Sequence, residues 1–262
     1  MAWWSAVLCA CTRLAHAAAD FSLAPCRPQA TKHEYAITYN DNSVLESHHV
    51  AAAWRVLLQD DCNFLKALSR EQYLELREMV IQFVLGTDMK FHFEHLTKFK
   101  TKVSADVFKK DTEREDVKYL LAVLMHTGDI ANPAKPMGLC LKWTEVVMEE
   151  FFQQGDLERK MKMPVSPFFD RDQTSVAQCQ MGFINILVLP LYTEVTNLLG
   201  EPARTECFGA LKANLSGADS RVVPACLPEH VCQSVFARAC LPERACLPAS
   251  VFCVRFLTTP MH

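Results

Sequence analysis

The sequence predicts an all-α fold on three observations. Between residues 34 and 199, apolar side chains recur at spacings of three and four, the period of an amphipathic helix. Ser or Thr followed three residues later by Glu or Gln marks several helix starts. No stretch alternates convincingly at the two-residue period of a strand. Because half of the 262 residues are hydrophobic, we expect a compact multi-helix bundle with short connections.

Composition divides the chain into three segments. Residues 1–33 form an atypical Ala-, Cys- and Trp-rich segment without a clear period. Residues 34–199 carry the helical pattern. Residues 200–262 form a tail with scattered Cys and Pro, in which "ACLPE" occurs twice. Since Pro breaks helices repeatedly there, we expect both end segments to be poorly ordered.

Capping signals place the first helices of the middle segment. Ser43–Glu46 reads as a capping box that opens a helix through about Leu58. Ser69–Gln72 opens a second helix through about Gly86. Thr112–Glu115 opens a third, which runs into His126.

Prolines and glycine delimit the next helix. Pro133 and Pro136 separate it from the helix before, and it covers about residues 138–154. Gly155 is expected to end it.

The final helix runs to about Leu199, with Asp172 or Thr174 as its cap and Pro190 as a candidate kink. One of its faces is apolar except for Gln180. That face consists of Val176, Cys179, Gln180, Phe183 and Leu187.

Bulk properties narrow the function classes. The net charge is −3 and no basic stripe occurs, so nucleic acid is not an expected partner. No apolar run approaches the ~20 residues of a membrane span, and the N-terminus lacks the basic region of a signal peptide. We therefore expect a cytoplasmic protein. The 12 Cys contain no C-x-x-C pair, which supports neither a disulfide framework nor structural zinc. The oligomeric state is not readable.

Gln180 has two readings. A buried amide needs partners, so it can be a core side chain bonded to a neighbouring helix. It can also be a pocket amide beside Phe183, because an amide that donates and accepts can read a nucleobase edge. On the preceding helix, Trp143, Val147 and Phe151 form a stripe for which core packing is the default reading.

The other polar residues also have structural readings. Glu46 fits the capping box as well as a catalytic role. His92 and His95 share a helical face, but no carboxylate or third His beside them in the sequence completes a zinc site. Asp129 and Asn132, in "HTGDIANPAK", fit a helix end followed by an Asn-Pro turn.

Six segments in order resemble the class I 3',5'-cyclic nucleotide phosphodiesterases. They cover about 165 residues. The segments are "YNDNSVLESHHVAAAW", "VLGTDMKFHF", "LMHTGDIANPAKP", "WTEVVMEEFFQQGDLE", "PVSPFFDRD" and "VAQCQMGFI".

The resemblance implies a fold, an activity and cofactors. The family's catalytic domain is a compact all-α bundle, of which this chain resembles the C-terminal part. The activity is hydrolysis of cAMP and/or cGMP to the 5'-nucleotide. A binuclear site of zinc with magnesium or manganese supplies the attacking hydroxide and neutralises the phosphate.

By position, the resemblance also implies site residues. Asp129 matches a zinc ligand. The nucleotide-binding positions are matched by Asn132, Val147, Gln180 and Phe183. The pocket wall or the shell of metal-bound waters is matched by Glu46, Thr87, Asp88, Met89 and Phe151.

Two upstream family motifs have no counterpart before Tyr35. One is H-N-x-x-H, whose first His is the general acid; the other is H-D-x-x-H. The resemblance thus leaves no catalytic side chain to assign and only one zinc ligand. We expect a partial phosphodiesterase catalytic domain whose 262 residues do not hydrolyse cyclic nucleotides. The alternative is a catalytically dead remnant that binds cyclic nucleotides or regulates a partner.

Overall fold

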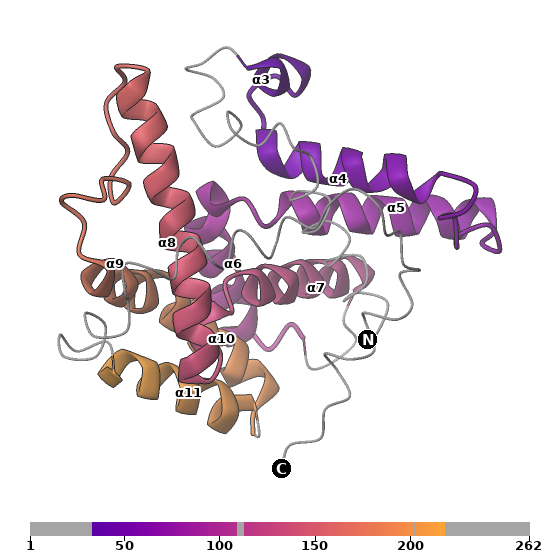
Figure 1. Ribbon diagram of the computed structural model, residues 1–262. Coiled ribbons are helices and arrows are strands. Elements are labelled where there is room, and N and C mark those ends of the chain that lie inside the picture. The colour runs from indigo at the N-terminus through magenta and orange to yellow at the C-terminus, as the bar shows by residue number, and fades with distance from the viewer. Residues whose placement is uncertain (1–32, 109–112, 202, 218–262) are drawn as a thin grey trace.

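A computed structural model describes residues 33–108, 113–201 and 203–217. The expected N-terminal segment, 1–33, lies outside these residues except for His33, as does the tail from residue 218 onward. Every regular element in the described ranges is helical, which confirms the predicted all-α class (Figure 1).

The first layer is a pair of helices preceded by a short one. The short helix is α3 (Glu34–Thr38), and the pair is α4 (Val44–Leu57) and α5 (Arg70–Leu85). A small apolar core holds the pair together, with Trp54 buried and Tyr73 edge-on against its indole. The buried members of this core are Val50, Trp54, Leu65 and Val80.

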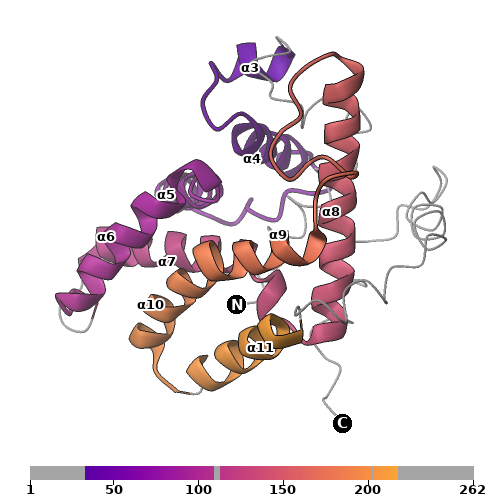
Figure 2. The ribbon, with the colours of Figure 1, turned by 90° about the vertical axis from the view of Figure 1, so that its left-hand side faces the viewer.

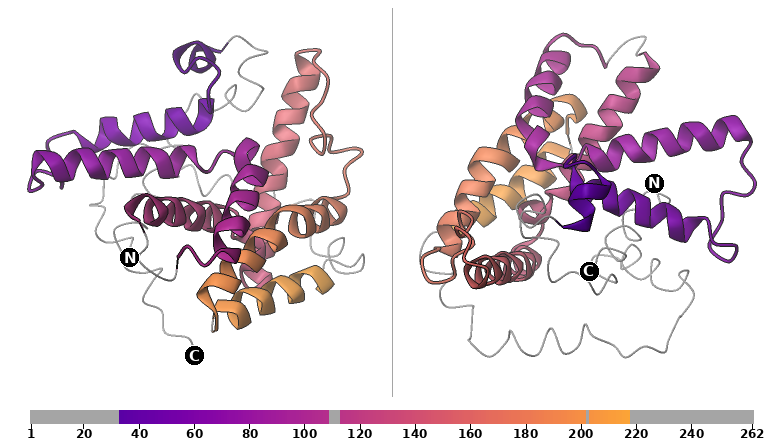
Figure 3. Two further views of the ribbon diagram at one scale, coloured as in Figure 1. Left: turned by 180° about the vertical axis from the view of Figure 1, so that it is seen from behind. Right: turned by 90° about the horizontal axis from the view of Figure 1, so that it is seen from above.

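The remaining helices form the larger part of the molecule. They are η1 (Met89–Phe91), α6 (His92–Ser104), α7 (Arg114–Asp129), η2 (Asn132–Ala134), α8 (Met137–Lys160), α9 (Val176–Phe183), the π-helical turn η3 (Ile184–Val188), α10 (Leu189–Leu199) and α11 (Ala203–Gly217). In the views from behind and above, α6 and α7 lie between the α4–α5 pair and the α10–α11 pair (Figure 3). The long α8 stands along one side (Figure 2).

The larger core lies where α6, α7, α10 and α11 meet. Its buried members are Phe99, Val123, Ile130, Ile184, Val188, Leu191, Tyr192, Val195 and Leu211. Ile184, Val188, Leu191 and Val195 recur at spacings of four, three and four through η3 and α10. This is not the predicted face: of Val176, Cys179, Phe183 and Leu187, Phe183 packs against this core, and α9 has no buried residue.

The two capping boxes that the described residues test have opposite outcomes. Ser69 and Gln72 bond reciprocally at the start of α5, as predicted. The box at Ser43 is wrong: Ser43 has φ 41°, and its side chain makes no cap bond. Its hydroxyl accepts a hydrogen bond from Lys90 Nζ instead, at 3.1 Å. For α7, Thr112 lies outside the described residues and Glu113 holds the cap position.

The predicted end of α8 at Gly155 is also wrong, because the helix continues to Lys160. A Cβ at Gly155 would lie 1.9 Å from the carbonyl oxygen of Phe169. The glycine therefore permits a close approach of two chain segments and does not terminate the helix.

The start of α9 lies slightly later than predicted. Ser175 is the cap, and its hydroxyl accepts from the amide of Gln178 at 3.4 Å; Asp172 and Thr174 are not used. The irregularity at Pro190 takes the form of the π turn η3 just before it. Since Pro190 has no N–H, the helical bond pattern must shift at this position.

Helical packing continues beyond residue 199. α11 packs against α10, η2 and α8, with Leu211 buried in the larger core. The helical unit therefore includes part of the segment expected to be a tail.

Candidate functional site

Three acidic residues from distant parts of the sequence form one electrostatic group. Glu46 lies in the first turn of α4, Asp88 caps η1 and Asp129 is the last residue of α7. Burial raises the pKa of Glu46, and the charges of Asp88 and Asp129 raise it further. We call these three residues the acidic group.

Lys90 connects the acidic group to the start of α4. Its ammonium lies 3.1 Å from Asp88 Oδ2 and 3.1 Å from Ser43 Oγ. Burial raises the pKa of Asp88, but hydrogen bonds from the Lys90 amide and from Ser43, together with the Lys90 charge, bring the pKa below its ordinary value. This lysine was not predicted, because its partner Ser43 is 47 residues away in the sequence.

The other two residues of this turn differ in exposure. Thr87 is half-buried, and its hydroxyl donates to the carbonyl of Val84 at 2.7 Å. Met89 is 39% exposed, so its side chain is available at the surface beside Asp88. The predicted pocket roles of Thr87 and Met89 remain predictions.

Asp129 is the one predicted metal ligand. The surrounding protein desolvates its carboxylate and raises its pKa. Within the described ranges, no group of three or more His, Cys, Asp or Glu side chains is placed to hold a metal ion. A catalytic zinc needs three or four protein ligands, so these residues do not fit the expected zinc and magnesium pair.

The histidines near this end of α7 are structural neighbours. His126 and His92 are both 1% exposed, and His126 Nε2 lies 2.9 Å from His92 Nδ1. The His95 ring centroid is 6.1 Å from that of His126. Burial and the two neighbouring rings lower the pKa of His126 to about 4. These rings are therefore neutral near pH 7 and join α6 to α7.

Gln180 forms the centre of a second group, between α8 and α9. Thr144 Oγ1 donates to Gln180 Oε1 at 3.3 Å, so the amide is bonded to a neighbouring helix. Val147 lies one turn beyond Thr144 on α8 and is half-buried. Phe183 lies one turn beyond Gln180 and packs against the larger core. The bond leaves both Nε2 donors and one carbonyl lone pair of Gln180 for other partners.

Phe151 continues the same side of α8, one turn beyond Val147. It stacks on Phe169, with ring centroids 4.4 Å apart and 13° between the planes. The sequence did not indicate Phe169. Gly155, which was interpreted as a helix end, was instead the signal of this close packing.

The turn between the two groups is held by α11. Asn132 opens η2 and is half-buried. Asn214 Nδ2 donates to the carbonyls of Pro133 and Lys135, at 2.7 Å each. Sequence reasoning missed Asn214 because it lies in the segment expected to be a disordered tail.

By length and composition, the helical run Val176–Leu199 could also cross a membrane. It is the single such helix within the described ranges. One face packs into the larger core through Ile184, Val188 and Leu191, and 33% of the apolar window is buried.

Comparison with known proteins identifies relatives of one kind. A dual specificity calcium/calmodulin-dependent 3',5'-cyclic nucleotide phosphodiesterase 1B from Bos taurus is 41% identical over 168 residues, which are 64% of this chain and 30% of that protein. A probable 3',5'-cyclic phosphodiesterase from Caenorhabditis elegans is 45% identical over 166 residues, 63% of this chain and 24% of that protein. The chain thus spans less than a third of the length of these relatives.

A solved structure shows the same fold. The phosphodiesterase domain of the RhoPDE fusion protein from the choanoflagellate Salpingoeca rosetta superposes with a TM-score of 0.70 at 31% identity. The match covers 76% of this chain and 62% of that one. The family model of the 3'5'-cyclic nucleotide phosphodiesterases matches residues 28–208, more than half of the chain. The chain therefore belongs to the 3',5'-cyclic nucleotide phosphodiesterase family.

Proposed function

We propose that residues 34–199 form the base-binding part of a site for 3',5'-cyclic nucleotides, cAMP and/or cGMP. In the proposed site, Gln180 reads the base edge, and Phe183 and Val147 contact the two faces of the base. Asn132 lies at the base end, and Phe151 and Met89 form walls. The acidic group lies on the phosphate side. By resemblance Asp129 matches a metal ligand, and Glu46, Thr87 and Asp88 match positions around metal-bound waters, but the described residues alone do not complete a metal site.

The bond between Thr144 and Gln180 is the observation that supports this proposal best. A half-buried amide fixed through its oxygen presents its two Nε2 donors in a defined direction. Purines offer an acceptor at N1 or O6, so either base can accept from this amide. The alternative reading, a core glutamine, predicts no ligand affinity.

For the 262 residues alone, we propose binding without measurable turnover. A single carboxylate does not hold a catalytic zinc, and the sequence contains no H-N-x-x-H motif to supply a general-acid histidine. Relatives named as cyclic nucleotide phosphodiesterases support hydrolysis as the activity of a complete site.

Calorimetric titration of the purified chain with cAMP and with cGMP tests the binding. We expect saturable binding that Gln180→Ala weakens roughly tenfold, since a lost hydrogen-bonding side chain costs about 1–3 kcal/mol. Gln82→Ala is a matched control, because Gln82 is exposed on α5 and bonds to Glu78. If Gln180→Ala and Gln82→Ala bind as the unchanged chain does, the proposed role of Gln180 is wrong.

A hydrolysis assay with zinc and magnesium, together with metal analysis of the dialysed protein, tests the second part. Substoichiometric zinc and no 5'-nucleotide are the expected results. Stoichiometric zinc with turnover would show that this chain holds a complete catalytic site.

A further inference from the structure

The connection between α8 and α9, residues 161–175, is fixed to α8 by a buried carboxylate. Glu158 has no exposed surface. It accepts hydrogen bonds from the backbone amide of Ser166 at 2.6 Å, from Ser166 Oγ at 2.7 Å and from Gln154 Nε2 at 3.0 Å. Because three hydrogen bonds converge on this buried carboxyl group, it attaches the middle of the connection firmly to α8.

Three residues further on, the connection touches α8 again. Phe169 places its carbonyl oxygen where a Cβ of residue 155 would be, and its ring stacks on Phe151. The space left by Gly155 is therefore filled by the connection. Any displacement of Phe169 moves the stacking partner of Phe151, which is a wall residue of the proposed nucleotide site.

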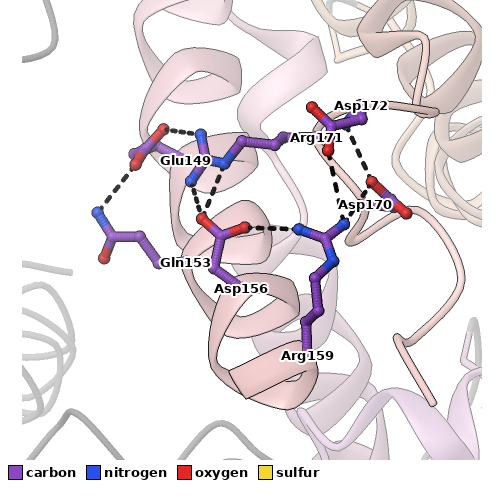
Figure 4. Close-up of polar contacts among 7 residues, drawn as sticks. All are labelled: Glu149, Gln153, Asp156, Arg159, Asp170, Arg171 and Asp172. Carbon is purple, nitrogen blue, oxygen red and sulfur yellow. Dashed lines mark hydrogen bonds and ion pairs between the residues drawn. The ribbon is translucent and has the colours of Figure 1, made fainter. Parts of the chain in front are cut away.

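An outer layer of ion pairs surrounds these contacts (Figure 4). Arg159 on α8 contacts Asp156, Asp170 and Asp172. Arg171 reaches back to Glu149 and Asp156. Both arginines are more than a third exposed, and exposed pairs contribute about 0–1 kcal/mol each. The buried Glu158 contact thus dominates the attachment.

The connection leads directly into the helix that carries Gln180. Ser175 caps α9, five residues before Gln180. A cavity of about 520 Å³ lies between the connection and the start of α9, and its lining includes Ser166, Phe168 and Cys179. The connection therefore bounds open space at the start of α9 and is not packed solidly against that helix.

We propose that residues 161–175 act as a strap whose position, set by the contact between Glu158 and Ser166, orients Phe151 and the start of α9. On this proposal Glu158 is a positioning residue: it touches no nucleotide but determines nucleotide affinity through Phe169. The part concerning affinity rests on the function proposed above, whereas the part concerning the strap does not.

Variants at the two ends of the contact test the proposal. In Glu158→Gln, the amide cannot accept all the hydrogen bonds that the carboxylate accepts. We expect about a tenfold rise in Kd for cAMP or cGMP, the equivalent of about 1.4 kcal/mol. Ser166→Ala should raise Kd by a smaller factor, whereas Ser166→Thr should keep the Kd of the unchanged chain because it keeps the hydroxyl. The double variant Glu158→Gln, Ser166→Ala should bind the nucleotide no more weakly than Glu158→Gln does. Glu94→Gln, the same chemical change on the exposed face of α6, is the matched control.

Amide hydrogen exchange gives a readout that needs no nucleotide. Glu158→Gln should speed exchange in residues 161–175 and around Phe151, while α5 and α7 stay as in the unchanged chain. If the unchanged chain binds no cyclic nucleotide, the proposed function fails and exchange alone decides on the strap. Three results would overturn the proposal. The first is unchanged exchange in residues 161–175, and the second is uniformly faster exchange in every helix. The third is faster exchange in residues 161–175 with an unchanged Kd, in a chain that binds nucleotide.

Discussion

The buried histidine pair predicts that the protein loses stability in mild acid. His126 and His92 are hydrogen-bonded between α7 and α6, and both are almost fully buried. Burial lowers the pKa of His126 from 6.5 to about 4, and the charges of His92 and His95 contribute to the shift. Burial and His95 also lower the pKa of His92, although the backbone of Leu187 acts in the opposite direction.

The sign and size of the effect follow from proton linkage. Between pH 6.5 and pH 4, the unfolded chain binds a proton at His126 that the folded protein excludes, so the free energy of unfolding falls as the pH falls. One pKa unit corresponds to about 1.4 kcal/mol. The depression to about 4 therefore removes about 3 kcal/mol by the acid end of the window.

Two carboxylates act against this loss. The pKa values of Glu46 and Asp129 are raised by burial. The folded protein therefore binds protons at these two carboxylates more readily than the unfolded chain does. As the pH falls towards the ordinary pKa of a carboxyl group, each of them raises the free energy of unfolding. The net slope should still have the sign set by the histidines, because His95 also has a lowered pKa, chiefly through burial.

Urea unfolding followed by far-ultraviolet circular dichroism at pH 7.0, 6.0, 5.0 and 4.5 measures the slope. The variant His126→Asn should be less stable at pH 7. Its free energy of unfolding should depend less on pH, because asparagine binds no proton in the unfolded chain. Gln82→Asn, an exposed substitution on α5 that removes no titrating group, is the control and should keep the slope of the unchanged chain. Equal slopes for the unchanged chain and His126→Asn between pH 6.5 and 4.5 would refute the reasoning.

Three further substitutions have defined outcomes. Gly155→Ala places a Cβ against the Phe169 carbonyl, and we expect a loss of about 1–3 kcal/mol in urea unfolding; an unchanged midpoint would contradict the close approach. Ser69→Ala removes the cap of α5 and should cost about 1 kcal/mol, whereas Ser47→Ala, whose hydroxyl bonds the exposed Asn42 carbonyl, should cost less. Asn214→Ala leaves the carbonyls of Pro133 and Lys135 without their donor and should lower the free energy of unfolding by about 1–3 kcal/mol, a value near zero being the contrary result.

The sequence was sufficient where one helix decides its own structure. The helical period predicted the all-α class, and the capping box at Ser69 and Gln72 forms because both partners lie within one turn. The period did not predict which face of the final helix enters the larger core, since that face begins at Ile184. The capping-box pattern failed at Ser43, which has φ 41° in place of the extended backbone usual for a cap residue and accepts a hydrogen bond from Lys90. Gly155 failed for a related reason: the residue that fills its space lies 14 positions later.

The candidate site shows the same division. Family motifs indicated Gln180, Asp129 and the residues around them, and the comparisons confirm the family. The partners that hold these residues could not be read from local pattern, because each comes from another element: Thr144 for Gln180, Lys90 for Ser43 and Asn214 for the turn after Asp129. Hydrogen bonds between helices carry no period in the sequence, so the groups that orient a site are harder to predict than those that line it. Thr144, Lys90 and Asn214 therefore became apparent in the structure and not in the sequence.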